Sequence, residues 1–146
     1  MTEEDKDLLL KDLCARLPYG VKIHANDTDV NIEKVGVLSM VDNDAVIAFT
    51  CDDENTYNYV TIHEVKPYLF PLSSMTKEQL FDVQEMLGKN EIEIEDSFLR
   101  ILDSDRNTIS YLEILALLEW FYKNHFDING LIEKGLAIDA TNLNIY

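Results

Sequence analysis

Apolar residues recur with a helical period at the start of the chain and again in its second half, and a strand-like pattern lies between. The first helical stripe comprises Leu9, Leu10, Leu13, Cys14 and Leu17. Its three- and four-residue spacing predicts an amphipathic helix. Thr2 followed by Asp5 predicts a capping box at the start of this helix, and Pro18 and Gly20 predict its end.

Four β segments follow, at residues 21–25, 30–41, 45–51 and 57–65. β-branched and aromatic residues dominate these segments, and turn residues separate them at hairpin lengths. Gly36 interrupts the second segment and predicts a bulge or a sharp bend there. We expect a small curled antiparallel sheet, as in an SH3-like barrel. Because sheets of so few strands seldom close, an open sheet backed by helices is the alternative.

A stiff apolar segment separates the β-rich half from the helical half. Pro67 and Pro71 keep its backbone extended and short of amide donors, while residues 68–70 between them are large and apolar. We expect this seam to cross between two layers and to bury side chains in both. The boundaries predicted within one compact domain are 1–65 for a helix and β unit, 66–75 for the seam, and 76–146 for a mainly helical unit.

Two further capping boxes predict helices after the seam. Thr76 with Gln79 opens the first of these helices, and Gly88 ends it. Ser110 with Glu113 opens the second, which is apolar around almost its whole circumference. A helix with that pattern is normally surrounded by other elements, so we predict that it is the central buried helix.

The remaining segments of the second half give weaker patterns. Residues 91–95 alternate as an edge strand does, whereas the six residues after them favour a helix. Asp127 is placed to cap a last short helix that runs through Lys134, and a polar tail follows.

Charge is the strongest compositional signal. The chain of 146 residues has 12 basic and 28 acidic residues, which gives a net charge of −16. Such a surface repels nucleic acid and anionic membranes, so we expect no direct binding to either. It suits a protein that imitates nucleic acid and occupies a basic groove on another protein; an acidic surface that only confers solubility is the alternative. The acidic N-terminus and the lack of an apolar run of about 20 residues predict a cytoplasmic protein.

One loop resembles a calcium-binding EF-hand. Asp103, Asp105 and Asn107 match the first, third and fifth positions of such a loop. Thr108, however, stands where the loop needs a glycine, and Glu113 comes one position too early to be the bidentate ligand. We therefore expect an acidic turn that caps the next helix, and no calcium ion.

Other chemistry has little support in the sequence. Cys14 and Cys51 have no metal-ligand or disulfide spacing, so both are predicted to be buried thiols. His24 and His63 lie on predicted strands and are placed to meet across the sheet, but a third ligand at a recognisable spacing is not evident. No activated nucleophile or glycine-rich phosphate loop is present. We predict a non-catalytic protein without a cofactor.

Acidic turns with neighbouring tyrosines are the predicted protein-binding site. Tyrosine flanked by carboxylates is a suitable partner for the arginine and lysine side chains of another protein. The residues assigned to this site are Asp42, Asp44, Asp52, Asp53, Glu54, Tyr57 and Tyr59. The alternative is that the rings only cover the β unit.

Three blocks of the sequence, at residues 12–21, 65–76 and 125–140, resemble a known family. It is a family of small uncharacterised proteins that occur in gut Bacteroides-type bacteria and in their phages and mobile elements. Ile128 and Asn129 depart from the Tyr-Arg pair typical of the third block. The resemblance implies an accessory protein of a phage or mobile element; because the family has no assigned activity, it assigns no catalytic residue.

Together these patterns predict an α+β protein that binds and inhibits or regulates a host protein with a basic surface. A small-molecule binder or an enzyme is the alternative, with a pocket near Tyr68 and Phe70 that holds His63 and a carboxylate. A third class is an assembly protein that acts as an oligomer.

Overall fold

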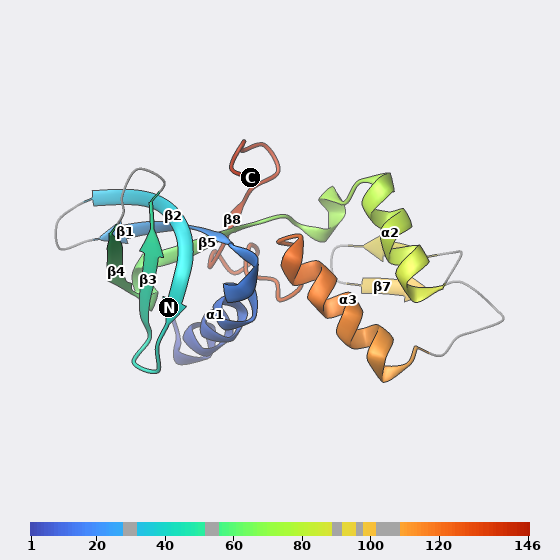
Figure 1. Cartoon of the computed structure of the whole chain (residues 1–146), viewed down its shortest axis with the longest axis horizontal. Helices are drawn as coiled ribbons and strands as arrows, with labels where there is room; N and C mark the ends of the chain where they lie inside the picture. Colours follow the sequence, from blue (N-terminus) through green and yellow to red (C-terminus); the bar gives the residue numbers. More distant parts are fainter. Residues whose placement is uncertain (28–31, 52–55, 89–91, 96–97, 102–108) are drawn as a thin grey trace.

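The computed structural model describes residues 1–27, 32–51, 56–88, 92–95, 98–101 and 109–146. The elements in chain order are α1 (Glu3–Arg16), η1 (Leu17–Tyr19), β1 (Lys22–Asp27), β2 (Ile32–Val41), β3 (Val46–Thr50), β4 (Tyr57–Thr61), η2 (Ile62–Glu64), β5 (Val65–Leu69), η3 (Leu72–Ser74), α2 (Lys77–Leu87), β6 (Ile92–Glu95), β7 (Phe98–Ile101), α3 (Tyr111–Lys123) and β8 (Ile138–Asp139). The predicted α+β class is confirmed. The main sheet and α1 form one lobe, the sheet lobe, and α2, α3 and the β6–β7 hairpin form a second, the helical lobe (Figure 1).

The main sheet is mixed and open. Its six strands lie in the order β4-β3-β2-β1-β5-β8, and all neighbours are antiparallel except β5 and β8. A barrel would require β4 to pair with the other edge, but β8 from the C-terminal segment occupies the position beside β5. The structure therefore has the open sheet that was the alternative to an SH3-like barrel.

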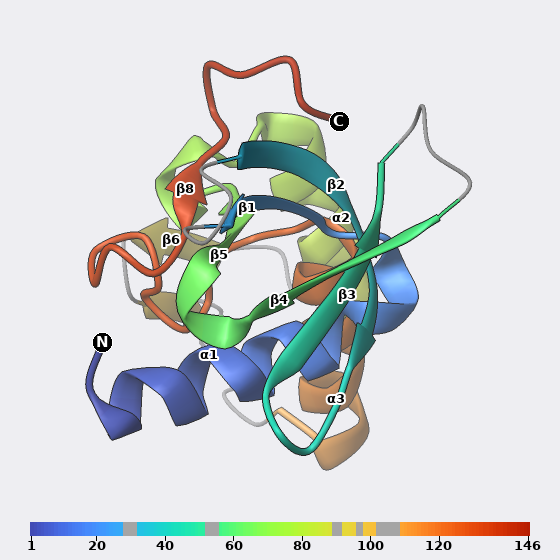
Figure 2. The same ribbon diagram turned by 90° about the vertical axis from the view of Figure 1, so that its left-hand side faces the viewer.

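Helix α1 begins at the predicted capping box and packs on one face of the sheet. The hydroxyl of Thr2 accepts a hydrogen bond from the Asp5 amide at 3.1 Å, and the Asp5 carboxylate accepts one from the Thr2 amide at 3.2 Å. Leu9 and Leu13 are fully buried in the core between this helix and the sheet. Figure 2 shows α1 running below the sheet. The prediction that Cys14 is buried is wrong: it lies about 100° around the helix from Leu13 and is exposed.

Gly36 lies where strands β2 and β3 approach each other closely. A Cβ atom at this position would lie 2.6 Å from a ring carbon of Phe49 and 2.6 Å from the carbonyl oxygen of Thr50. Real side chains do not tolerate such distances, so the position requires glycine for space and not for an unusual backbone conformation.

The bulge in β2 lies beyond Gly36, where the register with β3 shifts between Leu38 and Met40. The sequence predicted a bulge or bend at Gly36 itself, and the bulge lies a few residues further along the strand. The extra residue reverses the alternation of the strand, so that Leu38 and Val41 both contact the core although three positions separate them. Met40 consequently lies on the other face and is exposed.

The seam runs from the sheet lobe to the helical lobe. Val65 and Leu69 of β5 are buried in the core of the sheet lobe. Phe70, the next residue, forms a parallel bridge with Phe126: its amide donates to the His125 carbonyl at 2.9 Å, and its carbonyl accepts from the Asp127 amide at 2.8 Å. The backbone of the seam is thus held by the segment that follows α3.

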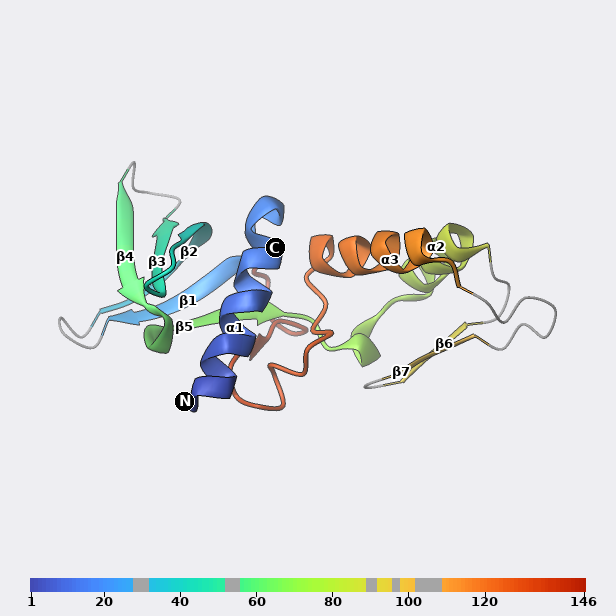
Figure 3. The ribbon, with the colours of Figure 1, turned by 90° about the horizontal axis from the view of Figure 1, so that it is seen from below.

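The helical lobe has its own core, built from one side of α3. Val83 and Leu87 of α2 pack there with Leu117 and Phe121 of α3 and with Phe126. The prediction that α3 is a central buried helix is wrong, because α2 and the seam cover only one side and its other side is exposed. Figure 3 shows α2 and α3 on one side of this lobe and the β6–β7 hairpin on the other.

Two segments that were predicted to be helical have other structures. Residues 98–101 form β7, which pairs with β6 in an antiparallel hairpin. The strand predicted at residues 91–95 is thus followed by a second strand and not by a helix. Residues 127–134 form turns in place of a helix. These turns return the chain to the sheet lobe, where Leu131 and Leu136 are buried in the core. A straight helix over the same residues would not bring both side chains there.

Candidate functional site

Tyr57 and Tyr59 project from the same face of β4, where they are 61% and 59% exposed. Tyr57 is paired with Thr50 of β3, and Tyr59 with Ala48. Ala48 is in turn paired with Met40 of β2. Side chains at directly paired positions of an antiparallel sheet lie on the same face. Met40 and Tyr59 therefore flank the small side chain of Ala48 and bury it.

The face that carries these side chains is opposite the one that α1 covers. Val35 and Met40 of β2 are 41% and 39% exposed on it. We call Val35, Met40, Tyr57 and Tyr59 together the tyrosine face. Since β4 is the outermost strand in the strand order, the tyrosine face extends to an edge of the sheet.

Of the acidic residues assigned to the same site, the structure describes Asp42 and Asp44. Asp42 and Asp44 lie in the turn that precedes β3, and the register of β3 with β4 places this turn near Thr61 (Figure 2). The Asp42 carboxylate accepts hydrogen bonds from the amides of Asp44 and Val46, both at 2.9 Å, so it also closes the turn.

Three residues of the predicted site, Asp52, Asp53 and Glu54, lie outside the described residues. By sequence they follow the other end of β3, next to Tyr57.

A second constellation, the junction, joins the two lobes and was not predicted from the sequence. Arg16 is fully buried at the C-terminal end of α1, with its Nε 2.6 Å and its Nη2 3.0 Å from the two carboxylate oxygens of Asp12. Nη2 also donates to the Phe126 carbonyl at 2.7 Å, and the side-chain amide of Asn129 donates to the Asp12 carboxylate at 2.9 Å. The guanidinium lies over the Tyr122 ring, 5.0 Å from its centroid.

Sequence reasoning missed the junction although one signal was available. Asp12 and Arg16 are four residues apart on a helix, which is the spacing of a side-chain ion pair. Most such pairs are exposed, and only the docking of the segment around Phe126 shows that this pair is buried. The three sequence blocks on which the family resemblance rests contribute Arg16, Phe70 and Phe126, respectively, and these blocks meet at the junction.

His125 and Tyr146 complete the junction on the other side. Their rings stack with centroids 4.2 Å apart, and the Tyr146 hydroxyl donates to the Tyr68 carbonyl at 2.8 Å. Burial, and to a smaller extent the Arg16 charge, lowers the pKa of His125 from 6.5 to about 4. Burial raises the pKa of Tyr146 to about 12.

One cavity lies beside the seam and has a volume of about 630 Å³. Its lining includes Asp127, Asn129 and Glu133. The Asp127 carboxylate accepts hydrogen bonds from the amides of Leu131 and Ile132 at 2.9 and 2.8 Å, and Asn129 is bonded to Asp12. Two of these three polar side chains therefore form hydrogen bonds within the protein, so few polar groups of this cavity remain to bind a ligand.

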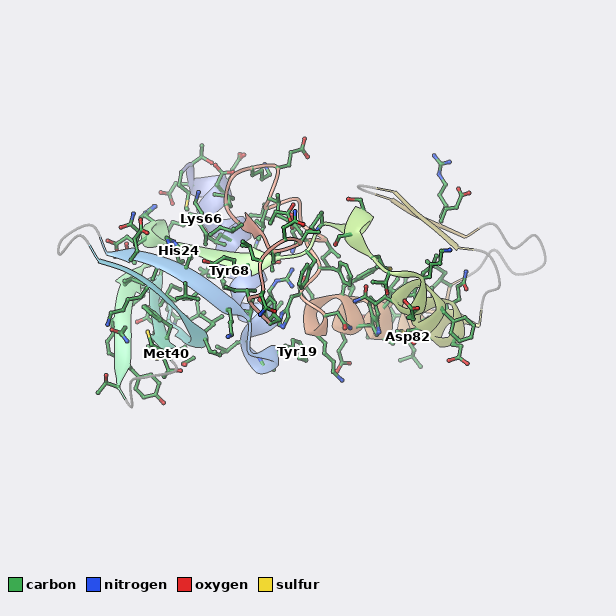
Figure 4. All side chains as sticks on the ribbon, turned by 90° about the horizontal axis from the view of Figure 1, so that it is seen from above. Tyr19, His24, Met40, Lys66, Tyr68 and Asp82 are labelled. Carbon is green, nitrogen blue, oxygen red and sulfur yellow. The ribbon has the colours of Figure 1, made fainter. Side chains whose placement is uncertain are left out.

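Another cavity, of about 330 Å³, is lined by the two histidines that were predicted to meet across the sheet. It is lined by His24, Asn26, His63, Glu64, Lys66 and Ile138, and Figure 4 shows His24 and Lys66 on adjacent strands beside Tyr68. The Glu64 carboxylate accepts hydrogen bonds from the amide and hydroxyl of Thr61, both at 2.9 Å. The remaining nitrogen groups of this cavity suit an anion better than a cation.

The described ranges contain no group of three His, Cys, Asp or Glu side chains that are placed to hold a metal ion. The loop from Asp103 to Asn107, which resembles an EF-hand in sequence, lies outside the described residues. In the same described ranges, no helix is long and apolar enough to cross a membrane. Cys51 is half-buried beside Asn58.

Comparisons of the chain with models of protein families, with curated proteins and with solved structures found no match.

Replacement of Arg16 by methionine is expected to destabilise the protein by about 3–5 kcal/mol, because it leaves the Asp12 carboxylate buried without its cation. Chemical denaturation measures this change, with Trp120, the only tryptophan, as the fluorescent reporter, since its ring stacks on Phe126 at 5.7 Å. The control is Lys11→Met, the same kind of substitution at an exposed position of α1. Equal effects of the two substitutions would contradict the role given to Arg16.

The depressed pKa of His125 predicts a loss of stability in acid. Between pH 6.5 and about pH 4 the unfolded chain binds a proton that the folded chain does not, so the free energy of unfolding decreases as the pH falls through this range. Allowing for the partial exposure of the ring, we expect a loss of about 1–2 kcal/mol.

The matched variant for this effect is His125→Asn, since asparagine tolerates the φ of +59° at this position. The difference in pH slope between the two proteins isolates His125 from the other titrating groups. Identical slopes would show that the ring is not protected from protonation.

Proposed function

We propose that the protein is a non-catalytic accessory protein that binds the basic surface of a host protein and thereby inhibits or regulates it. The single observation that supports this proposal is the tyrosine face. Its two tyrosine rings are about 60% exposed on an edge strand of a protein whose net charge is −16. Tyrosine provides a rigid apolar surface with a polar end, which suits contacts with arginine and lysine stems.

The charges around the tyrosine face determine the kind of partner. Asp44 is exposed in the turn before β3, and Glu33 is exposed on β2 with its carboxylate 3.7 Å from His24. An acidic rim attracts a basic partner at long range and orients it, while the central aromatic side chains supply most of the contact energy.

The edge position of β4 favours an extended segment of the partner. The outer edge of β4 faces no strand in the described sheet order, so a basic peptide in a β conformation is placed to pair with its backbone. The alternating side chains of such a peptide would then lie against Tyr57 and Tyr59, which are two residues apart. Nucleic-acid mimicry is the special case in which the partner's natural ligand is DNA or RNA.

Replacing Tyr57 and Tyr59 with serine is expected to weaken binding to a basic partner at least about tenfold, because two aromatic contacts are lost. The first probe is a synthetic peptide of alternating arginine and valine, titrated by calorimetry. Partners from host lysate, identified by mass spectrometry, are then measured in the same way. Raising NaCl from about 50 to about 500 mM is expected to weaken binding by a similar factor.

Phe81→Ser is the control for these measurements, because Phe81 is an aromatic side chain of similar exposure, 58%, on α2 of the helical lobe. Competition between the partner's own DNA or RNA and the protein tests mimicry. Binding that is insensitive to salt, or that is reduced equally by Phe81→Ser, would reject the tyrosine face as the site.

A second candidate function is the binding of a small anion in the cavity of His24, His63 and Lys66. The observation that favours it is the convergence of three nitrogen side chains in a protein with few basic residues. Inorganic phosphate is expected to move the imidazole NMR signals of His24 and His63 saturably, with a dissociation constant on the order of 1 mM.

Lys66→Ala is expected to weaken this phosphate binding, whereas Lys77→Ala, at an exposed position of α2, leaves it unchanged. Signals that do not move, or that move linearly without saturation, would remove this candidate.

A further inference from the structure

Helix α3 is apolar on its outward side as well as on the side that faces the core. Its exposed large side chains are Tyr111 (74%), Leu112 (75%), Ile114 (42%), Leu115 (45%) and Leu118 (39%). The core of the helical lobe covers only Leu117 and Phe121 fully. A helix that is apolar all round is normally covered all round, so the outward side requires a partner.

The outward side has the spacing of a helix–helix contact. With 3.6 residues per turn, Leu115 lies at the centre of the exposed side, directly opposite the core. Tyr111, Leu115 and Leu118 follow each other at intervals of four and three residues, which is the repeat of a seam between two paired helices. Tyr122, four residues further along, belongs to the junction, where Arg16 lies over its ring. The partner of this seam is therefore expected to be another helix.

Charge narrows the choice of partner. Along α3 the exposed charged residues are Glu119 and Lys123, which have opposite signs, whereas the whole chain carries a net charge of −16. Most surfaces of a second copy would repel this protein, but two outward sides of α3 would bring almost no net charge together. An apolar helix with little net charge is what a second copy offers at this position.

We propose that two copies of the chain pair through α3, antiparallel and related by a two-fold axis. In this register Leu115 of each copy lies opposite Leu118 of the other. The arrangement is self-complementary, as an isologous interface must be. It leaves the tyrosine face of each copy free, because β4 lies in the other lobe (Figure 1).

The available area is sufficient for such a dimer. The exposed apolar side chains of α3 amount to roughly 500 Å² per copy, so the pair would bury about 1,000 Å², which is near the lower limit for a specific interface. We therefore expect a reversible dimer that forms at micromolar concentrations and not a permanent one.

Light scattering and sedimentation of the full chain, in reducing buffer and over a range of concentrations, test the proposal. A monomer–dimer equilibrium is expected, and it is expected to shift toward the dimer when NaCl rises from about 50 to about 500 mM, since salt screens the repulsion between two acidic bodies. This response is opposite to that of the tyrosine face, so failure of one proposal is distinguishable from failure of the other.

Leu115→Lys and Leu118→Lys are expected to weaken the dimer at least about 100-fold, because two-fold symmetry introduces each charge twice. Both side chains are partly exposed in a single copy, so the variants are expected to remain folded, which circular dichroism checks. Tyr57→Lys is the control: it replaces an exposed aromatic side chain in the sheet lobe and leaves the dimer intact.

Cross-linking gives a second measurement that does not depend on stability. With Cys14 and Cys51 replaced by serine, a Leu115→Cys variant is expected to form a disulfide-linked dimer on oxidation much faster than a Phe81→Cys variant on α2. A protein that stays monomeric at high salt and about 100 μM, or a dimer that survives Leu115→Lys, would overturn the proposal.

Discussion

The buried ion pair of Arg16 and Asp12 is the interaction on which the arrangement of the two lobes depends. The Nε and Nη2 groups of the guanidinium donate to a carboxylate on the same helix and to the Phe126 carbonyl, so the side chain fixes the position of the chain after α3 relative to α1. The Phe126 backbone in turn holds the seam at Phe70. Removal of two charges from water is costly unless their hydrogen bonds are formed, and this requirement defines one geometry for three distant segments.

Hydrophobic contacts alone would define that geometry less closely. The sheet lobe and the helical lobe have separate cores, and the aromatic ring of Phe126 belongs to the helical one while its carbonyl is bound from the sheet lobe. Apolar surfaces slide past each other at little cost, whereas a forked guanidinium accepts a small range of positions. The junction therefore joins the two lobes through directional hydrogen bonds, and the stacked rings of His125 and Tyr146 are part of it.

The two exposed surfaces that carry the functional proposals have opposite character. The tyrosine face has two exposed aromatic rings, and under the proposed function electrostatic attraction would strengthen its contact with a basic partner. The outward side of α3 is apolar with almost no net charge, and in the proposed dimer the overall charge of the chain would oppose the contact. The two surfaces lie on different lobes, so the two proposals are compatible with each other.

The local pattern of the sequence determined most helices and strands of this protein and the ends of its helices. The capping boxes at Thr2, Thr76 and Ser110 are formed as predicted, because a cap depends on residues only three positions apart. Tertiary structure decided what local pattern does not contain: that the sheet stays open, that Asp12 and Arg16 are buried while Cys14 is not, and that α3 is covered on one side only. Each of these depends on segments that are distant in the sequence, since the strand that occupies the sheet edge and the carbonyl that binds Arg16 both come from the C-terminal part of the chain.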